Sequence, residues 1–242
     1  MMLRMPADSI SSLDALLSAW KPINDAHRGN NRYSTGVHLR IYRCLSWAMK
    51  AERLDIESDA DLVLILRIIG FNSLWGRSYE PGGQHIGEHK TWAEFLVALT
   101  QHDEMLQGRM ARLFRGHTEL FQAICESPFF HREFWAEPGA ASLQENADIA
   151  ERVRMRLKDG RTGTLLWEFT RRILLLRGQV VHGNATCGSS LNRDTVQAAG
   201  TALDLLLRTV LEVIILDGVH DQDLDWVPVP YDPGQELPGK TT

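Results

Sequence analysis

The sequence predicts an all-α protein in which antiparallel helices form a bundle, with additional short helices and an irregular C-terminal tail. Apolar residues recur at spacings of three and four along most of the 242 residues, and no segment alternates apolar with polar residues as a half-buried strand would. The composition, 44% hydrophobic and 24% charged, is that of an ordinary globular protein rather than a collagen or a small disulfide scaffold. A chain of this length buries roughly 70% of its unfolded surface, so we expect the fold to need no metal and no crosslink.

The N-terminal third predicts one short helix followed by a pair of longer ones. Residues 9–20 form the short helix, and the Asn- and Gly-rich residues 21–32 predict a loop. The next helix runs from about residue 34 to about Leu54, and Ser58 is the expected N-cap of the helix after it, which continues into residues 71–76. Their faces are expected to be marked by Val37, Ile41, Leu45 and Ala48 on the first helix, and by Leu62, Leu66 and Ile69 on the second.

The middle of the chain predicts shorter elements. Residues 80–88 are rich in Pro and Gly and predict an irregular loop. Thr91 followed by Glu94 forms a capping box that should open a helix through Leu99. Residues 101–135 indicate two or three short helices, and a further helix covers residues 143–158, ended by Asp159 and Gly160.

Two C-terminal helices have the clearest apolar seams, as an antiparallel bundle requires. The seam residues are Leu166, Phe169, Ile173, Leu176 and Val180 on the first, and Val196, Ala199, Leu203, Leu206, Val210 and Val213 on the second. The loop between them, about 182–192, contains Gly183 and Gly188. We therefore expect one domain over residues 1–242, with the short helix 9–20, a core at 34–217 and an acidic, Pro-rich tail at 218–242.

The charge is distributed unevenly. The net charge of -5 comes from residues 216–242, which hold six acids and one base, so the rest of the chain is neutral. Residues 152–177 hold eight bases and two acids, which predicts either a solvated helix face or a basic patch that attracts phosphate. Three cysteines without a CxxC pair, Cys44, Cys125 and Cys187, indicate reduced thiols. With no secretory h-region and no uninterrupted apolar span, we expect a soluble, cytoplasmic protein.

Two motif matches lack the context that their chemistry needs. Residues 234–241 match the phosphate-loop pattern, but no helix can follow them within the chain to hold phosphates at its N-terminus. His85 and His89 have the spacing of zinc ligands on a helix, but Gly87 lies between them in a Gly-rich segment. We expect no metal and no cofactor.

Arg177 and His182 are the candidate catalytic residues. Arginine is a permanent cation whose planar fork suits a phosphate, and histidine both accepts and donates protons near neutral pH. Together they can cleave RNA without a metal. Five residues at 100° each place them about 140° apart on a helix, so they share a face only if the helix loosens or if a second chain meets them. In the alternative interpretation, Arg177 pairs with an acid and His182 caps the helix.

The block around these residues resembles a known family. Residues 177–186 read Arg-Gly-Gln-Val-Val-His-Gly-Asn-Ala-Thr, followed by Asn192-Arg193-Asp194 and a long apolar helix. This is similar to the signature of bacterial HEPN proteins of the ApeA-like group, which typically have Leu-Arg-Asn-Gln-Leu-Val-His-Gly-Gly-Ala-Thr. Weaker similarities are Tyr42, Trp47, Ala51-Glu52, the Phe-Asn-Ser-Leu-Trp-Gly segment at 71–76 and Asp225-Trp226.

The resemblance implies a HEPN-type helical bundle, frequently a homodimer, in which the Arg and His of two subunits meet. Many members resemble toxins or antiphage and stress effectors that cut RNA without a metal and leave a 2',3'-cyclic phosphate. By position, Arg177 and His182 are then catalytic, and RNA is the expected partner. The residues expected to support the motif or bind RNA are Asn184, Thr186, Arg193, Arg171 and Arg172, with Asn72 a buried polar group that orders the helix pair.

One residue departs from the family pattern. Active members commonly have Asn, Asp or His directly after the motif arginine, whereas this chain has Gly178. Two alternatives to a ribonuclease therefore stay open: a catalytically inactive HEPN module that binds RNA or nucleotides or dimerises, and a protein silenced by an antitoxin or sensor partner.

Overall fold

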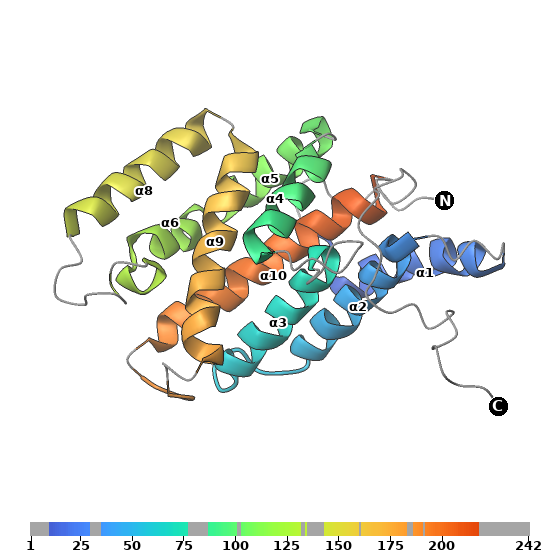
Figure 1. Cartoon of the computed structure of the whole chain (residues 1–242), viewed down its shortest axis with the longest axis horizontal. Helices are drawn as coiled ribbons and strands as arrows, with labels where there is room; N and C mark the ends of the chain where they lie inside the picture. Colours follow the sequence, from blue (N-terminus) through green and yellow to red (C-terminus); the bar gives the residue numbers. More distant parts are fainter. Residues whose placement is uncertain are drawn as a thin grey trace.

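Every regular element in the described part of the chain is a helix. The structure is a computed structural model and describes residues 10–29, 35–76, 87–100, 103–131, 134, 143–159, 161–182, 186–190 and 192–217, with no strand among them. The helices are α1 (Leu13–Gly29), α2 (Thr35–Ala51), α3 (Ala60–Trp75), α4 (Glu88–Thr100), α5 (Asp103–Gly116), α6 (Thr118–Glu126), the 3-10 helix η1 (Pro128–Phe130), α8 (Leu143–Lys158), α9 (Thr162–Val181) and α10 (Arg193–Ile215) (Figure 1). The all-α prediction is confirmed.

Helices α3 and α10 form the centre of the bundle. Fifteen of the 23 residues of α10 are buried, and α10 contacts α1, α3, α5, α6 and α9. Helix α2 runs back antiparallel along α3 (Figure 1). The two backbones approach closely at Gly70, where a Cβ atom would lie 3.2 Å from the carbonyl oxygen of Cys44. The glycine therefore sets the spacing of this helical hairpin.

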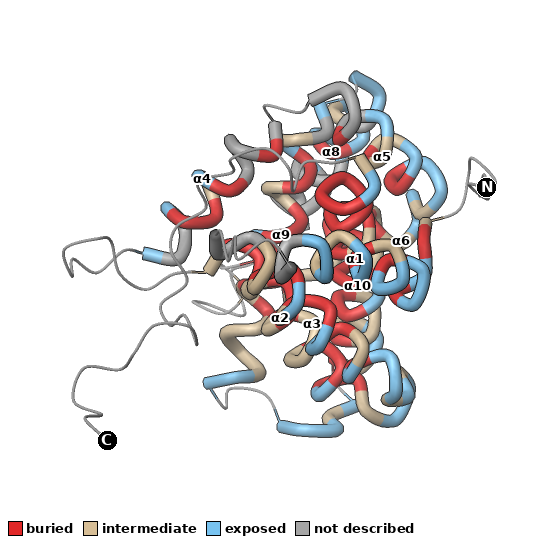
Figure 2. Tube along the Cα trace, turned by 90° about the vertical axis from the view of Figure 1, so that its right-hand side faces the viewer, coloured by how far each residue is buried: buried red, intermediate tan, exposed pale blue. Residues whose placement is uncertain are grey.

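The buried side chains form one continuous core between the helices, with exposed residues on the outer turns (Figure 2). Aromatic contacts join helices that are far apart in sequence. The ring of Trp92 on α4 lies 5.3 Å, between centroids, from Phe71 on α3 and 5.4 Å from Phe95. Phe121 on α6 lies 4.6 Å from Phe169 on α9. The contact between Trp92 and Phe71 attaches α4 to α3, and the contact between Phe121 and Phe169 attaches α6 to α9.

The predicted helix over 143–158 is confirmed as α8, which lies on the outside against α6 and α9 (Figure 1). The two or three short helices predicted for 101–135 are confirmed as α5, α6 and η1. Both predicted C-terminal seams are also confirmed. Every seam residue is buried except Val180 at the end of α9, which is partly buried.

The loop predicted for residues 21–32 is wrong over its first nine residues, because α1 continues through Pro22 to Gly29. A proline inside a helix removes one backbone hydrogen bond. Packing on both sides of it compensates for this loss: Trp20 is 1% exposed and Ile23 packs against the core. Tertiary contacts therefore extend a helix that the local sequence ends.

Two predicted helix caps are also wrong. Helix α3 is preceded by Asp59, with no side-chain capping bond, while the Ser58 hydroxyl donates to the Asp55 carboxylate at 3.2 Å. Helix α4 begins at Glu88, so Thr91 lies inside its first turn and is 3% exposed. Its backbone N–H donates to the carbonyl of Gly87. Neither helix therefore starts at the expected cap.

The predicted face of α3 is the wrong one. Leu62 is 51% exposed, and Leu66 and Ile69 are only partly buried, whereas Leu64 and Phe71 are buried. Helix α3 has apolar residues on nearly all its sides, and α2, α4, α9 and α10 all contact it. Such a helix offers no single apolar stripe from which periodicity could select a face.

An ion-pair network fixes the C-terminal end of α10. Arg109 on α5 donates to Glu212 at 2.6 Å and, through two nitrogens, to Asp217 at 2.7 and 2.8 Å. The other oxygen of Glu212 accepts the backbone N–H of Ser11 at 2.7 Å. The hydrogen bonds to Asp217, more than the burial that opposes them, raise the pKa of Arg109. This end of α10 is thereby joined to the start of α1.

No helix in the described residues is long and apolar enough to cross a membrane. The acidic tail 218–242 lies outside the described residues, and so do the phosphate-loop match at 234–241 and His85.

Candidate active site at the end of α9

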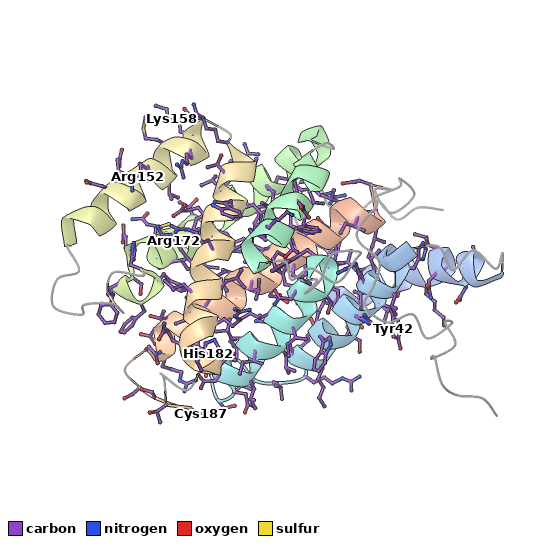
Figure 3. All side chains as sticks on the ribbon, in the orientation of Figure 1. Tyr42, Arg152, Lys158, Arg172, His182 and Cys187 are labelled. Carbon is purple, nitrogen blue, oxygen red and sulfur yellow. The ribbon has the colours of Figure 1, made fainter. Side chains whose placement is uncertain are left out.

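The last two turns of helix α9 run from the core to the surface and contain the candidate residues. Leu176 is fully buried, Arg177 is partly buried, and Val181 is 55% exposed. His182 follows directly, with an exposed side chain at the end of the helix (Figure 3). Because α9 is anchored along its buried seam, it holds both candidate residues on a rigid support.

The helix stays regular up to His182. The backbone N–H of His182 donates to the carbonyl of Gly178 at 3.1 Å, which continues the helical pattern. His182 occupies the C-cap position of α9, and the bond just described is made by its backbone N–H. The side-chain cap of the alternative interpretation stays a prediction. The roughly 140° between Arg177 and His182 therefore persists, and a single chain presents them in different directions.

Gly178 leaves space beside the imidazole. A Cβ atom at this position would lie 4.0 Å from Cδ2 of His182 and would meet no other atom within van der Waals distance. Residue 178 therefore has room for a Cβ atom next to His182.

The segment after α9 is held by Asp61 on α3. Its Oδ2 atom accepts the backbone N–H of Gly188 at 3.0 Å and the Arg193 guanidinium at 3.0 Å. Gly188 has a φ of +73°, a left-handed conformation that glycine adopts without strain. Thr186 is exposed nearby, with its carbonyl accepting the N–H of Ser189 at 3.0 Å. Asp61 thus attaches both this segment and Arg193 to α3. Asn184 lies outside the described residues.

The basic stretch 152–177 is partly neutralised. Arg156, Arg171 and Arg172 all lie within 4.0 Å of Glu168, at 4.0, 3.5 and 2.6 Å. Burial alone would raise the pKa of Glu168, but Arg172 and Arg171 outweigh it and hold the pKa below its ordinary value. The stretch is therefore not a uniform cationic face.

Two of its other cations, Arg152 and Lys158, are exposed on α8 in the upper part of Figure 3, whereas His182 lies in the lower part. They lie on a different element from the candidate pair, which belongs to α9.

Arg172, predicted to bind RNA, is 2% exposed and lies in the interior (Figure 3). Besides Glu168, it contacts the ring of His131, whose Nε2 lies 3.1 Å from the carbonyl oxygen of Cys125. The same Arg172 nitrogen, Nη1, lies 3.2 Å from Nε2 and 3.4 Å from Nδ1 of that ring, so the guanidinium contacts both ring nitrogens. Burial raises the pKa of the Cys125 thiol to about 12. Arg172 therefore joins α9 to η1 and the end of α6, whereas Arg171 is exposed.

Asn72 lies in the last turns of α3, with its side-chain Oδ1 buried and without a hydrogen-bond partner. The nearby helix end is capped by Arg40, which sequence reasoning missed. Its guanidinium donates to the carbonyls of Ser73 at 3.2 Å and Gly76 at 3.0 Å. A cation at a helix C-terminus is favourable, but nothing in the sequence distinguishes Arg40 from Arg43, the other arginine of α2.

The polar residues that sequence reasoning missed have partners that lie far from them in the sequence. Asp61 and His131 lie 127 and 41 residues from the groups that they contact, Gly188 and Arg172. Their only signal in the sequence is a polar residue in an apolar neighbourhood, and that signal gives no partner.

The described residues contain no group of three or more His, Cys, Asp or Glu side chains that could hold a metal ion. The side chain of His89 is not among the described side chains. The chain matches no family model, no curated protein and no solved structure.

Proposed function

We propose that this protein is a metal-independent endoribonuclease of the HEPN type, acting as a homodimer in which Arg177 and His182 of two chains form one site. The observation that carries the proposal is the exposed His182 at the end of a helix anchored by its buried seam, about 1.4 turns from Arg177. The regular backbone between them keeps the two about 140° apart. A second chain would bring its own pair to the same phosphate.

The apolar surface at this end of the bundle supports a contact between two chains. Val181 is 55% exposed beside His182, and Leu62, in the first turn of α3, is 51% exposed. Helix α3 begins where α9 ends (Figure 1), and its Asp61 holds Gly188 from the segment after α9. A contact between copies across this end would bury both apolar side chains and bring the two histidines together.

The chemistry needs two proton transfers and a charge stabiliser. One His182 accepts the proton of the ribose 2'-hydroxyl, whose oxygen attacks the adjacent phosphorus. The bond from phosphorus to the 5'-oxygen breaks, and the His182 of the other chain donates a proton to that oxygen. Arg177 stabilises the negative charge on the pentacoordinate phosphorus. The products are a 2',3'-cyclic phosphate and a 5'-hydroxyl.

The test is incubation of the purified protein with tRNA and single-stranded RNA in excess EDTA. Cleavage should be lost in His182→Ala and Arg177→Ala and kept in the matched controls His117→Ala and Arg115→Ala, which lie outside both α9 and the basic stretch 152–177. Intact RNA at every protein concentration, or unchanged cutting by His182→Ala, contradicts the catalytic proposal. Sedimentation over a range of concentrations tests the homodimer separately.

The second candidate is a non-catalytic module that binds RNA or nucleotides, and Gly178 favours it because no polar side chain supports His182 from that position. This candidate predicts binding that weakens as salt rises, without cleavage. An antitoxin or sensor partner that silences the chain predicts instead that a second protein from the same operon co-purifies and suppresses cleavage.

A further inference from the structure

A groove with aromatic, apolar and basic lining runs along α1 and α2, away from the end of α9. Its volume is about 470 Å³, and its lining includes Leu17, Tyr42, Trp47, Met49, Lys50 and Arg53. Tyr42 lies on the other side of the molecule from Arg152 and Lys158 in Figure 3. This site is separate from the candidate active site and from the basic stretch on α8 and α9.

The groove exposes groups that usually have a partner. Tyr42 is 55% exposed, Trp47 39% and Leu17 37%, and all three line it. Lys50 and Arg53 are exposed cations, and the lining residues that the structure describes include no acid. A complementary ligand is therefore anionic and carries flat apolar groups.

The chain itself supplies such a segment directly after α10. Residues 218–242 hold five acids and one base, with Trp226 and Tyr231 on either side of Val-Pro-Val-Pro at 227–230. Alternating prolines favour the extended polyproline conformation, which binds to aromatic-lined grooves at a low cost in conformational entropy.

The starting point of this segment lies close to the groove. Asp217 is fixed by Arg109, and the same network holds Ser11 just before α1. Leu17, which lines the groove, follows Ser11 by six residues, roughly 9 Å along a helix. The nine residues from Asp217 to Trp226 span up to about 30 Å when extended, which is long enough to reach the groove.

We propose that residues 221–231 bind in the groove between α1 and α2 of the same chain. Their aspartates pair with Lys50 and Arg53, and Trp226 and Tyr231 contact Tyr42 and Trp47. The tether raises the effective concentration of the segment to the millimolar range, so weak contacts suffice. A nucleic acid is the less suitable occupant because it would compete with a polyanion attached to the same molecule. This proposal does not depend on ribonuclease activity.

The position of the segment is tested by placing a photo-crosslinking amino acid at Trp226 in the full chain. Crosslinks within one molecule to residues 42–53 or to Leu17 are expected. Crosslinks between molecules, to other helices only, or none at all overturn the proposal.

The pairing of the aspartates with Lys50 and Arg53 is tested with a protease that cleaves on the N-terminal side of aspartate. The segment contains three such sites, at 221, 223 and 225. Lys50→Glu with Arg53→Glu should speed cleavage there by about fivefold, the effect expected for the loss of two exposed ion pairs. The matched control, Arg152→Glu with Lys158→Glu, changes the net charge equally and should leave the rate unchanged. Equal rates in wild type and the groove variant, or equal acceleration in the control, overturn the proposal.

Discussion

Replacing Glu168 with glutamine removes the charge that neutralises Arg172 in the interior of the bundle. The Arg172 side chain is 2% exposed and the Glu168 side chain 14%, and the two lie 2.6 Å apart. Glutamine keeps the shape and one accepting oxygen, so the variant tests the charge rather than the packing. Arg172 stays ionised at all ordinary pH values and keeps its contacts with Phe130 and His131.

The expected loss follows from this burial. Removing one partner of a buried ion pair costs about 3 to 5 kcal/mol because a buried charge is left uncompensated. Since glutamine still accepts a hydrogen bond and Glu168 is partly accessible to water, we expect about 3 kcal/mol, near the lower end. This is a large part of the roughly 5 to 15 kcal/mol that stabilises a typical domain.

Urea unfolding followed by far-ultraviolet circular dichroism measures this change. The matched control is Glu151→Gln, because Glu151 pairs with Arg154 at 3.0 Å with side chains 61% and 50% exposed. The control should lose less than about 1 kcal/mol. A second variant, Glu168→Gln with Arg172→Met, should recover most of the stability because it removes the stranded charge. A loss equal to that of the control, or no recovery, refutes the reasoning.

The difference between wild type and Glu168→Gln also depends on pH. The folded-state pKa of Glu168 is lowered from its ordinary value of 4.5, so its contribution is complete above that value. It disappears as pH falls below 4.5 through the lowered pKa. Acid titration of both proteins should therefore bring their free energies of unfolding together, and a difference that widens on acidification would contradict the assignment.

Three further predictions concern glycine, Asp61 and the thiols. Gly178→Ala should raise the free energy of unfolding by about 1 kcal/mol through helix propensity, since the added Cβ has open space. Gly70→Ala should lower it by about 1 kcal/mol or more, because the Cβ lies 3.2 Å from a backbone oxygen. Thermal melts in which both variants shift the melting temperature in the same direction contradict this. Asp61→Asn should weaken the tie to Arg193 and speed amide hydrogen exchange at residues 186–190, and unchanged exchange there argues against the anchor. In the native protein a thiol reagent should modify the exposed Cys187 quickly. Cys44 and Cys125 should react only on unfolding, because burial shields their thiols and raises their pKa values. Fast reaction of all three cysteines contradicts the burial of Cys44 and Cys125.

Local sequence was sufficient for elements whose boundaries depend on local signals. Helix α8 has the predicted bounds, 143–158, because Asp159 and Gly160 end a periodic segment. The seams of α9 and α10 are buried as predicted, apart from the partly buried Val180, because their apolar residues recur at helical spacing along the whole of each helix. The candidate pair, Arg177 and His182, was also identified from the sequence, and the structure places His182 at the surface at the end of α9.

Other features required the assembled helices. The sequence by itself determined the helical class, the two C-terminal seams and the uneven distribution of charge. Tertiary structure alone decided that α1 continues past Pro22, that Arg172 lies inside beside Glu168, and that Arg193 is held by Asp61. The physical reason is one of range. Periodicity and helix-ending residues act within a few positions of the chain, whereas the desolvation and pairing of a charge depend on which side chains other helices bring to it.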